Sequence, residues 1–458
     1  MNSERVTQLS LLLLDLAMTV LVFNLIAHLR GVADHFLFGA LVLPAATLVI
    51  SVYLIDGYRA RTDMLSVDYA SQHTIALVLA TLGTLLFTFV FVSDGYALQS
   101  SRGVIALSFV GLFFLTLGYR RMIYQRTLAW RGERSLVFLG DRASGRIFRD
   151  ECKTMGTRQP VIYAVAGTTS APPFDVTDDD GCTPPFFENV LEDIRAGHID
   201  VEAIILRESG RELAPAVSQQ LVQLYFSGVP TYTLELFHQI HWQKIPLYRL
   251  NQTWLFQEGF QIAREPVFER IKRWSDLSLT LAGLVLATPA LLAAALLIWL
   301  EDRGPIFFTQ TRIGLNHVPF RIIKLRTMRV RPDAGERYTR VGDARITRMG
   351  RLLRATRADE FPQLWNVFRG QMSLIGPRAE WDRLVTDYER EIPCYHFRHL
   401  VRPGITGWAQ INYPYGASLA DTLRKLEYDL YYIRHFSFRL DASIVLKTVH
   451  VILFGKGR

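Results

Sequence analysis

Four long apolar segments dominate the first part of the chain. They cover approximately residues 9–27, 36–55, 75–92 and 104–119. Each approaches or reaches the ~20 residues that an α-helix needs to cross a hydrocarbon core of ~30 Å. The first segment is too long for a signal peptide and lacks a small-residue cleavage site, so we interpret it as a span. The pattern predicts a membrane protein with a four-helix transmembrane bundle over residues 1–131.

Positive charge follows the second and fourth segments and is sparse after the other two. Arg59 and Arg61 follow the second segment. The fourth is followed by five arginines, Arg120, Arg121, Arg126, Arg131 and Arg134. Because cytoplasmic loops carry the excess of Lys and Arg, both ends of the bundle are predicted to face the cytoplasm. For Asp15, Asn24 and His28, in or beside the first segment, hydrogen bonding between helices is favoured over a transport site.

Strand and helix patterns alternate between residues 132 and 262. Apolar runs at 135–139, 161–166 and 203–206 predict buried strands of a parallel, Rossmann-like α/β domain. Gly140 and Gly145 keep the outer positions of a dinucleotide fingerprint, but Ala143 and Ser144 leave no middle glycine. A structural or regulatory domain is therefore favoured over a nucleotide-binding one. Residues 167–187 contain many Thr, Pro and Asp residues and predict a flexible loop.

A fifth apolar segment, at about 277–300, lies near the start of the C-terminal part, residues 263–458. It contains Thr288-Pro289 and has basic residues on both sides. Because both flanks favour the cytoplasmic side, the pattern predicts a re-entrant helix that breaks at Thr288 and Pro289 and returns to the same face. Thr288 or a neighbour is expected to satisfy the carbonyl group that the proline frees. A kinked span with an extracytoplasmic catalytic domain is the alternative.

Charge is concentrated just beyond this segment. Between residues 303 and 357, fourteen Lys and Arg residues face three Asp and Glu residues, a net charge of +11 in a chain whose total is +8. Such a segment must face anions, namely lipid headgroups, a phosphorylated lipid or a nucleotide diphosphate. We exclude nucleic acid, because no recognition motif accompanies the charge and the segment adjoins the predicted membrane dip. Three cysteines, Cys152, Cys182 and Cys394, show neither metal-ligand spacing nor a disulfide framework.

The adjacent acids Asp359-Glu360 follow the last arginines of this basic segment. Pro362 predicts that a helix begins just after the pair, and Thr356, three residues before Asp359, predicts a capping box. A carboxylate at a cation-lined helix N-terminus can attack a phosphate as a nucleophile or hold a divalent metal ion. A helix start with favourable acids and surface arginines is the alternative.

Six ordered motifs in the C-terminal part resemble the monotopic phosphoglycosyl transferases, bacterial sugar transferases that load a sugar 1-phosphate onto a polyprenyl phosphate. The motifs cover residues 304–310, 320–328, 359–367, 372–378, 402–412 and 429–433. The order of bundle, Rossmann-like domain and transferase is similar to the long form that initiates exopolysaccharide, capsule or O-antigen synthesis. For the transferase the resemblance implies a mainly α (α+β) domain.

The resemblance implies a reaction in two steps. Asp359 would attack the sugar-bearing phosphate of a UDP-sugar and expel UMP, and undecaprenyl phosphate would then attack the aspartyl-phosphosugar. Glu360 would hold Mg²⁺, and Arg354 would assist catalysis. Further residues are implied to contact or support the substrates: Lys324, Arg326, Arg378, Arg402 and Asp429.

The resemblance also implies a homodimer in the bacterial inner membrane, with a cytoplasmic catalytic domain and downstream glycosyltransferases as further partners. Two rivals stay open: a catalytically silent membrane scaffold for polysaccharide assembly, and direct glycosyl transfer, which would release UDP. The chain departs from the family pattern at Arg357-Ala358, at Ala379 and at residues 413–416. The last two departures touch the implied nucleotide and sugar pocket and leave the sugar undetermined.

Overall fold

The protein is described by a computed structural model that divides into two compact units. The described residues are 3–32, 35–59, 62–91, 97–132, 134–157, 159–164, 185–207, 215–247, 265–329, 345–413, 416 and 418–454. One unit comprises Met1–Thr62, Ser66–Leu117 and Leu247–Arg458, and the other comprises Asp63–Leu65 and Gly118–Pro246. Arg61, most of the loop predicted over 167–187 and the domain boundary predicted at 262 lie outside the described residues.

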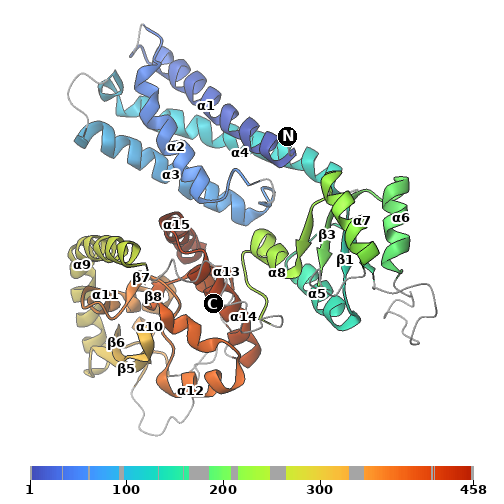
Figure 1. The fold of residues 1–458 in the computed structure, drawn as a ribbon. Helices are drawn as coiled ribbons and strands as arrows, with labels where there is room; N and C mark the ends of the chain where they lie inside the picture. The colour runs from blue at the N-terminus through green and yellow to red at the C-terminus, as the bar shows by residue number, and fades with distance from the viewer. Residues whose placement is uncertain are drawn as a thin grey trace. The chain divides into compact units, whose positions relative to one another are not determined.

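The N-terminal helices are α1 (Ser3–Leu29), α2 (Val42–Leu54), α3 (Val67–Leu86) and α4 (Arg102–Gly132) (Figure 1). The helices of the first, third and fourth predicted segments are long and apolar enough to cross a membrane, which is consistent with a membrane protein. The helix of the second predicted segment, α2, is shorter. With the 3-10 turn that precedes α2 it forms an apolar helix over Gly39–Leu54, about 24 Å long at about 1.5 Å per residue.

Polar side chains of α1 bind neighbouring loops. Asp15 is fully buried and accepts a hydrogen bond from the Tyr58 hydroxyl. The Asn24 side chain donates to the backbone carbonyl of Leu37 at 2.9 Å and accepts from the Leu37 N–H at 2.6 Å. Both contacts are internal, but their partners lie outside helices, so they are not the hydrogen bonds between helices that the sequence favoured.

The second unit contains a four-stranded parallel sheet of order β2-β1-β3-β4. The strands are β1 (Ser135–Leu139), β2 (Val161–Ala164), β3 (Val201–Leu206) and β4 (Thr231–Thr233). Its helices are α5 (Arg142–Thr154), α6 (Phe187–Ala196), α7 (Pro215–Phe226) and the short α8 (Leu234–Phe237). The two central strands, β1 and β3, are mostly buried, which explains the apolar runs at 136–139 and 203–206 within them. The three predicted strands are thus present.

Gly140 follows β1 and packs against the end of β3. A Cβ atom at Gly140 would lie 2.7 Å from the Cβ atom of Arg207, so a larger residue would collide. The Arg207 side chain in turn pairs with Asp141 at 2.8 Å. Close packing of strand ends therefore explains this glycine of the degenerate fingerprint without a nucleotide.

The C-terminal part begins with a single helix, α9 (Pro266–Asp302), which continues through Pro289 although it changes direction along its length (Figure 1). Pro289 lacks the N–H that would bind the carbonyl of Val285 four residues earlier. The Thr288 hydroxyl donates to the Leu284 carbonyl at 2.6 Å instead. Thr288 therefore does not satisfy the freed carbonyl, and satisfaction by a neighbour stays a prediction. The predicted helix break at Thr288 and Pro289 is wrong, because α9 continues through both residues.

Both ends of α9 pack on the same compact body, which is formed by the helices and strands that follow α9 in the chain. Near its start, the Asp276 carboxylate accepts a hydrogen bond from the Leu374 N–H at 3.2 Å. Near its end, the Glu301 carboxylate accepts one from the Arg348 N–H at 2.8 Å. The stretch between them exposes large apolar side chains, among them Leu279, Leu281, Val285, Leu286 and Leu292.

The body on which α9 packs is mainly helical, with two small sheets. Strands β5 (Phe307–Ile313) and β6 (Pro319–Leu325) form an antiparallel hairpin, and β7 (Ser373–Ile375) pairs in parallel with β8 (Gly404–Thr406). The helices are α10 (Arg348–Thr356), α11 (Gln363–Phe368), α12 (Asp382–Glu391), α13 (Trp408–Asn412), α14 (Leu419–Arg434) and α15 (Phe438–Phe454). A core of Phe320, Ile322, Val367 and Met372 joins the hairpin to α11.

Glycines let the segments around β7 and β8 approach backbone to backbone. A Cβ atom at Gly376 would lie 2.4 Å from the Arg402 carbonyl oxygen, and one at Gly407 would lie 2.1 Å from the Gly376 carbonyl oxygen. Arg378, two residues after Gly376, forms a bridge with Gly404 at the start of β8. The glycine motifs thus fix the backbone that carries Arg378.

Candidate active site

The acid pair lies in a 3-10 turn, Ala358–Glu360, between α10 and α11. The chain enters this turn through Arg357, whose left-handed φ of 54° ends α10. Pro362 immediately precedes α11, as predicted, because the start of a helix requires no N–H there. The predicted capping box is wrong. Thr356 is the last residue of α10, and its hydroxyl donates to the Leu352 carbonyl at 3.1 Å.

Glu360 is buried among cations that come from three directions. Its Oε1 atom accepts a hydrogen bond from Lys324 Nζ of β6 at 2.8 Å, and an Arg378 guanidinium nitrogen lies 3.7 Å from the same oxygen. Arg357 lies 3.8 Å from Oε2. Burial alone raises the pKa of Glu360, but Lys324, Arg378 and Arg357 outweigh burial and hold it at about 2. Glu360 is therefore ionised and its charge is compensated.

Asp359 has a different environment. It is half-buried and forms no salt bridge with another described side chain. Burial and the charge of Glu360 raise the pKa of Asp359, against the opposing effect of Lys324 and Arg354. The two adjacent carboxylates thus have different surroundings, which shift their pKa values in opposite directions. Such a difference separates the chemical roles of two acids in enzyme sites.

Arg354 lies on α10, and Arg326 directly follows β6. Arg354 Nε donates to the Thr327 hydroxyl at 2.9 Å, which directs its side chain toward the end of β6. Arg326 is buried, and a Cβ atom at Gly304 would lie 2.7 Å from its guanidinium. Gly304 therefore leaves room for the Arg326 guanidinium, and contact of Arg326 with a substrate stays a prediction.

Asp429 is linked to Arg378, and so to the acid pair, through Arg398. It is 2% exposed and accepts a hydrogen bond from Arg398 at 2.9 Å. Arg398 also donates to the Arg378 backbone carbonyl at 2.9 Å and to the Tyr395 hydroxyl at 2.5 Å. Burial raises the pKa of Asp429 to about 6, and the charge and hydrogen bond of Arg398 oppose this rise. Asp429 thus positions Arg398, and Arg398 positions Arg378.

The structure does not bring Arg402 to the acid pair. Its guanidinium pairs with Glu269 of α9 at 3.2 Å and donates to the Gly370 carbonyl at 3.3 Å. Arg402 lines a separate small cavity with Lys272 and Asp276, also from α9. These contacts assign Arg402 to the packing of α9 on the body.

A small polar pocket next to Lys324 contains a residue that the sequence reasoning missed. The pocket is lined by Arg312, Lys324, Gln363 and Arg378. Gln363 is 3% exposed, and its Nε2 group makes no hydrogen bond with any described residue. An unsatisfied buried amide donor beside three cations suits an anionic ligand. Its position in the 359–367 motif was the available signal.

The acid pair also offers ligands for a hard cation. Carboxylate oxygens are the donors that Mg²⁺ takes, usually together with waters and substrate phosphates. Asp359 and Glu360 supply such oxygens at one place in the fold. Because Lys324 and Arg378 already face Glu360, a metal ion at Glu360 competes with these side chains.

Comparison with known proteins places this site in a family. A model of the bacterial sugar transferase family matches residues 267–455, which include every element of the body. The exopolysaccharide production protein PSS of Rhizobium leguminosarum bv. phaseoli is 40% identical over 195 residues, which cover 41% of this chain and 98% of that protein. The chain belongs to the bacterial sugar transferase family.

Two longer matches extend beyond the sugar transferase region. The UDP-N-acetylgalactosamine-undecaprenyl-phosphate N-acetylgalactosaminephosphotransferase of Aeromonas hydrophila is 37% identical over 262 residues, covering 57% of this chain and 61% of the relative. The UDP-glucose:undecaprenyl-phosphate glucose-1-phosphate transferase of Escherichia coli K12 is 32% identical over 329 residues, covering 69% of this chain and 67% of the relative. This sugar transferase thus matches less than two thirds of the Aeromonas protein's length.

Proposed function

We propose that this sugar transferase moves a sugar 1-phosphate from a UDP-sugar to undecaprenyl phosphate through an aspartyl-phosphosugar on Asp359. The observation that carries the proposal is the difference between the surroundings of Asp359 and those of Glu360. Glu360 is compensated by Lys324 and Arg378, whereas Asp359 is unpaired among the described side chains and has a raised pKa. The names of the Aeromonas and Escherichia relatives describe reactions of this class.

In the first step, an Asp359 carboxylate oxygen attacks the phosphorus that bears the sugar. The bond from that phosphorus to the bridging oxygen breaks, and the electron pair leaves with UMP. A carboxylate with a raised pKa is the better nucleophile once it is ionised. Lys324, Arg354 and Arg378 bring positive charge toward the diphosphate, whose negative charge must shift to the leaving nucleotide.

In the second step, a phosphate oxygen of undecaprenyl phosphate attacks the same phosphorus. The acyl-phosphate bond breaks, Asp359 is regenerated as a carboxylate, and polyprenyl-diphospho-sugar is formed. Because the two substrates react in turn, one shallow site can serve both of them. In this proposal the Gln363 amide, which lines the pocket with Lys324 and Arg378 and lacks a partner among the described residues, holds a phosphate or sugar oxygen.

We further propose Mg²⁺ as the cofactor, with Glu360 as its protein ligand. When bound, the ion neutralises the diphosphate and stabilises the departing nucleotide. A bound ion would replace part of the charge compensation that Lys324 and Arg378 give Glu360, whose carboxylate they otherwise keep ionised.

For the membrane arrangement, we propose that α9 enters one leaflet and returns. This proposal is supported by the contacts of the two ends of α9. Asp276 near its start and Glu301 near its end bind the same body, while the stretch between them exposes apolar side chains. A straight crossing would place these two ends on opposite sides of the bilayer. The basic flanks favour the cytoplasmic face of the inner membrane. We also propose a structural or regulatory role for the Rossmann-like second unit, a homodimer, and recruitment of downstream glycosyltransferases.

The deciding experiment uses purified protein in nanodiscs with Mg²⁺, undecaprenyl phosphate and a panel of UDP-sugars, and identifies the released nucleotide. We expect UMP with at least one sugar, dependent on the lipid acceptor for turnover and lost in Asp359→Asn. Release of UDP would contradict the phosphosugar route and favour direct glycosyl transfer. No release by correctly folded protein with any sugar would favour the catalytically silent scaffold.

A further inference from the structure

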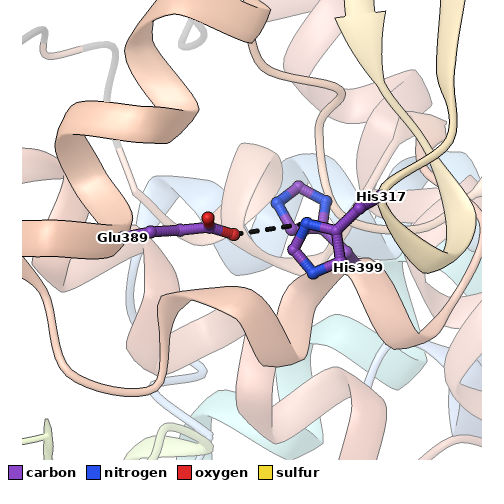
Figure 2. Close-up of side chains that lie close together, drawn as sticks. All are labelled: His317, Glu389 and His399. Carbon is purple, nitrogen blue, oxygen red and sulfur yellow. Dashed lines mark ion pairs between the residues drawn. The ribbon is translucent and has the colours of Figure 1, made fainter.

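Three metal-ligating side chains converge on the body outside the acid pair. His317 ends the turn Leu315–His317 between β5 and β6, Glu389 lies on α12, and His399 lies in the 3-10 segment Tyr395–Leu400. Figure 2 shows the Glu389 carboxylate directed toward His317, with the His399 ring beside it. One potential ligand atom from each residue lies within 4.8 Å of the other two.

The spacing of two of these groups already suits a tetrahedral metal ion. His317 Nδ1 lies 3.4 Å from Glu389 Oε1. Two ligand atoms that bind Zn²⁺ at about 2.0–2.1 Å in tetrahedral geometry are separated by roughly 3.4 Å. The imidazole rings of His317 and His399 have their centroids 4.7 Å apart, so a modest side-chain adjustment brings the third ligand into range.

Burial gives a second, independent observation. His399 is 5% exposed, and its Nε2 atom has no hydrogen-bond partner among the described residues. A buried polar atom without a partner is costly, and a metal ion bound through this nitrogen would remove that cost. The side chains of His317 and Glu389 are 49% and 33% exposed, so an ion can reach the cluster from solvent.

We propose that His317, Glu389 and His399 form a binding site for a divalent transition-metal ion of the Zn²⁺ class. Two imidazoles and one carboxylate are a ligand set that Zn²⁺ takes, whereas Mg²⁺ prefers oxygen ligands alone. The site is distinct from the acid pair, since neither Asp359 nor Glu360 belongs to the cluster. It therefore does not depend on the proposed reaction.

A metal ion here would tie together elements that hold the active-site backbone. His399 follows Arg398, whose guanidinium binds the Arg378 carbonyl and Asp429. Ligation of His399 would join this segment to α12 and to the β5–β6 turn. We expect the bound ion to stabilise the fold around Arg378 without taking part in the chemistry.

The test is Zn²⁺ binding by the full chain in nanodiscs, purified with a tag that contains no histidine and freed of metal by chelation. We expect one Zn²⁺ per chain by calorimetry and elemental analysis, in the presence of excess Mg²⁺. His317→Gln and Glu389→Gln should each weaken binding at least about tenfold, the scale seen for loss of groups that support a metal site. Both side chains are partly exposed, so these variants should fold.

His396→Gln is the matched control, because this exposed histidine lies in the same segment but outside the cluster. It should bind Zn²⁺ like the unchanged protein. Co²⁺ should give the intense visible absorption of a tetrahedral site, and Glu389→Gln should lose that absorption. Absence of Zn²⁺ binding, or equal binding by His317→Gln and Glu389→Gln, would overturn the proposal and leave only a salt bridge between His317 and Glu389.

Discussion

Lys324 Nζ lies 2.8 Å from Glu360 Oε1, whereas the adjacent Asp359 forms no salt bridge with another described side chain. This asymmetry comes from the backbone. Lys324 is on β6, which packs beside the 3-10 turn that carries both acids, and it meets the second acid of the pair. Glu360 is thereby fixed as an ionised, compensated group, and Asp359 keeps a carboxylate that can react.

The first prediction concerns the covalent intermediate. Without lipid acceptor, the protein should release at most one UMP per active site and gain the mass of a sugar phosphate on the peptide that contains Asp359. Asp359→Asn should lose turnover by on the order of 10⁴-fold, as expected when one member of a catalytic unit is removed. Intact-protein mass spectrometry and rapid-quench analysis measure both quantities. A stoichiometric burst in Asp359→Asn would exclude this residue as the nucleophile.

The second prediction concerns pH. Asp359 must be ionised to attack, and its pKa is raised above that of an ordinary aspartate, about 3.9. Activity should therefore fall as the pH decreases through this raised pKa. Because Arg354 opposes the shift, Arg354→Gln should move the acidic limb of kcat/KM to higher pH. Arg351→Gln, an exposed residue of the same helix, should leave the limb in place. An unchanged limb in Arg354→Gln would contradict the assignment.

The third prediction separates stability from activity at the Arg398–Asp429 pair. Asp429→Asn leaves a buried guanidinium without its carboxylate and should lower the free energy of unfolding by about 3–5 kcal/mol. The double change Arg398→Met and Asp429→Leu should recover much of that loss, since apolar pairs can replace buried ion pairs. Activity should stay low, because the bond from Arg398 to the Arg378 carbonyl is absent. Recovery of UMP release in the double variant would show that Arg398 does not position Arg378.

The fourth prediction concerns Gln363. Gln363→Leu removes a buried amide that has no partner among the described residues, so the melting temperature should remain equal or rise. The KM for the UDP-sugar should increase, by about tenfold if one hydrogen bond to a charged group is lost. Gln363→Glu should reduce kcat/KM further, because it places a negative charge beside Lys324 and Arg378. Equal kcat/KM values for all three proteins would place Gln363 outside the substrate pocket.

Local patterns predicted much of this molecule. The strands 135–139 and 203–206 were visible because buried parallel strands are continuous apolar runs, and the turn after the acids was visible because Pro362 fits a helix start. The 304–378 motifs likewise marked the region of Lys324, Asp359 and Arg378. The structure brings these residues together around Glu360.

Contacts between distant residues were the part that the sequence did not reveal. Arg398 lies 20 residues from Arg378 and 31 from Asp429, and no short pattern marks a guanidinium that joins them. Arg402 lay in a motif next to the site, yet its side chain turns to Glu269 of α9. The length of α9 was also hidden, because one missing N–H at Pro289 does not stop a helix whose neighbouring turns remain bonded.

The two ends of α9 rest on one body, near Leu374 and near Arg348. With α9 re-entrant, as we propose, the transferase would work at a single surface of the bilayer, and the charged diphosphate of its proposed product would stay at that surface. Charged groups cross hydrocarbon only at high cost. On this proposal, a polysaccharide completed on the opposite side would require a protein that carries the lipid-linked sugar across the membrane.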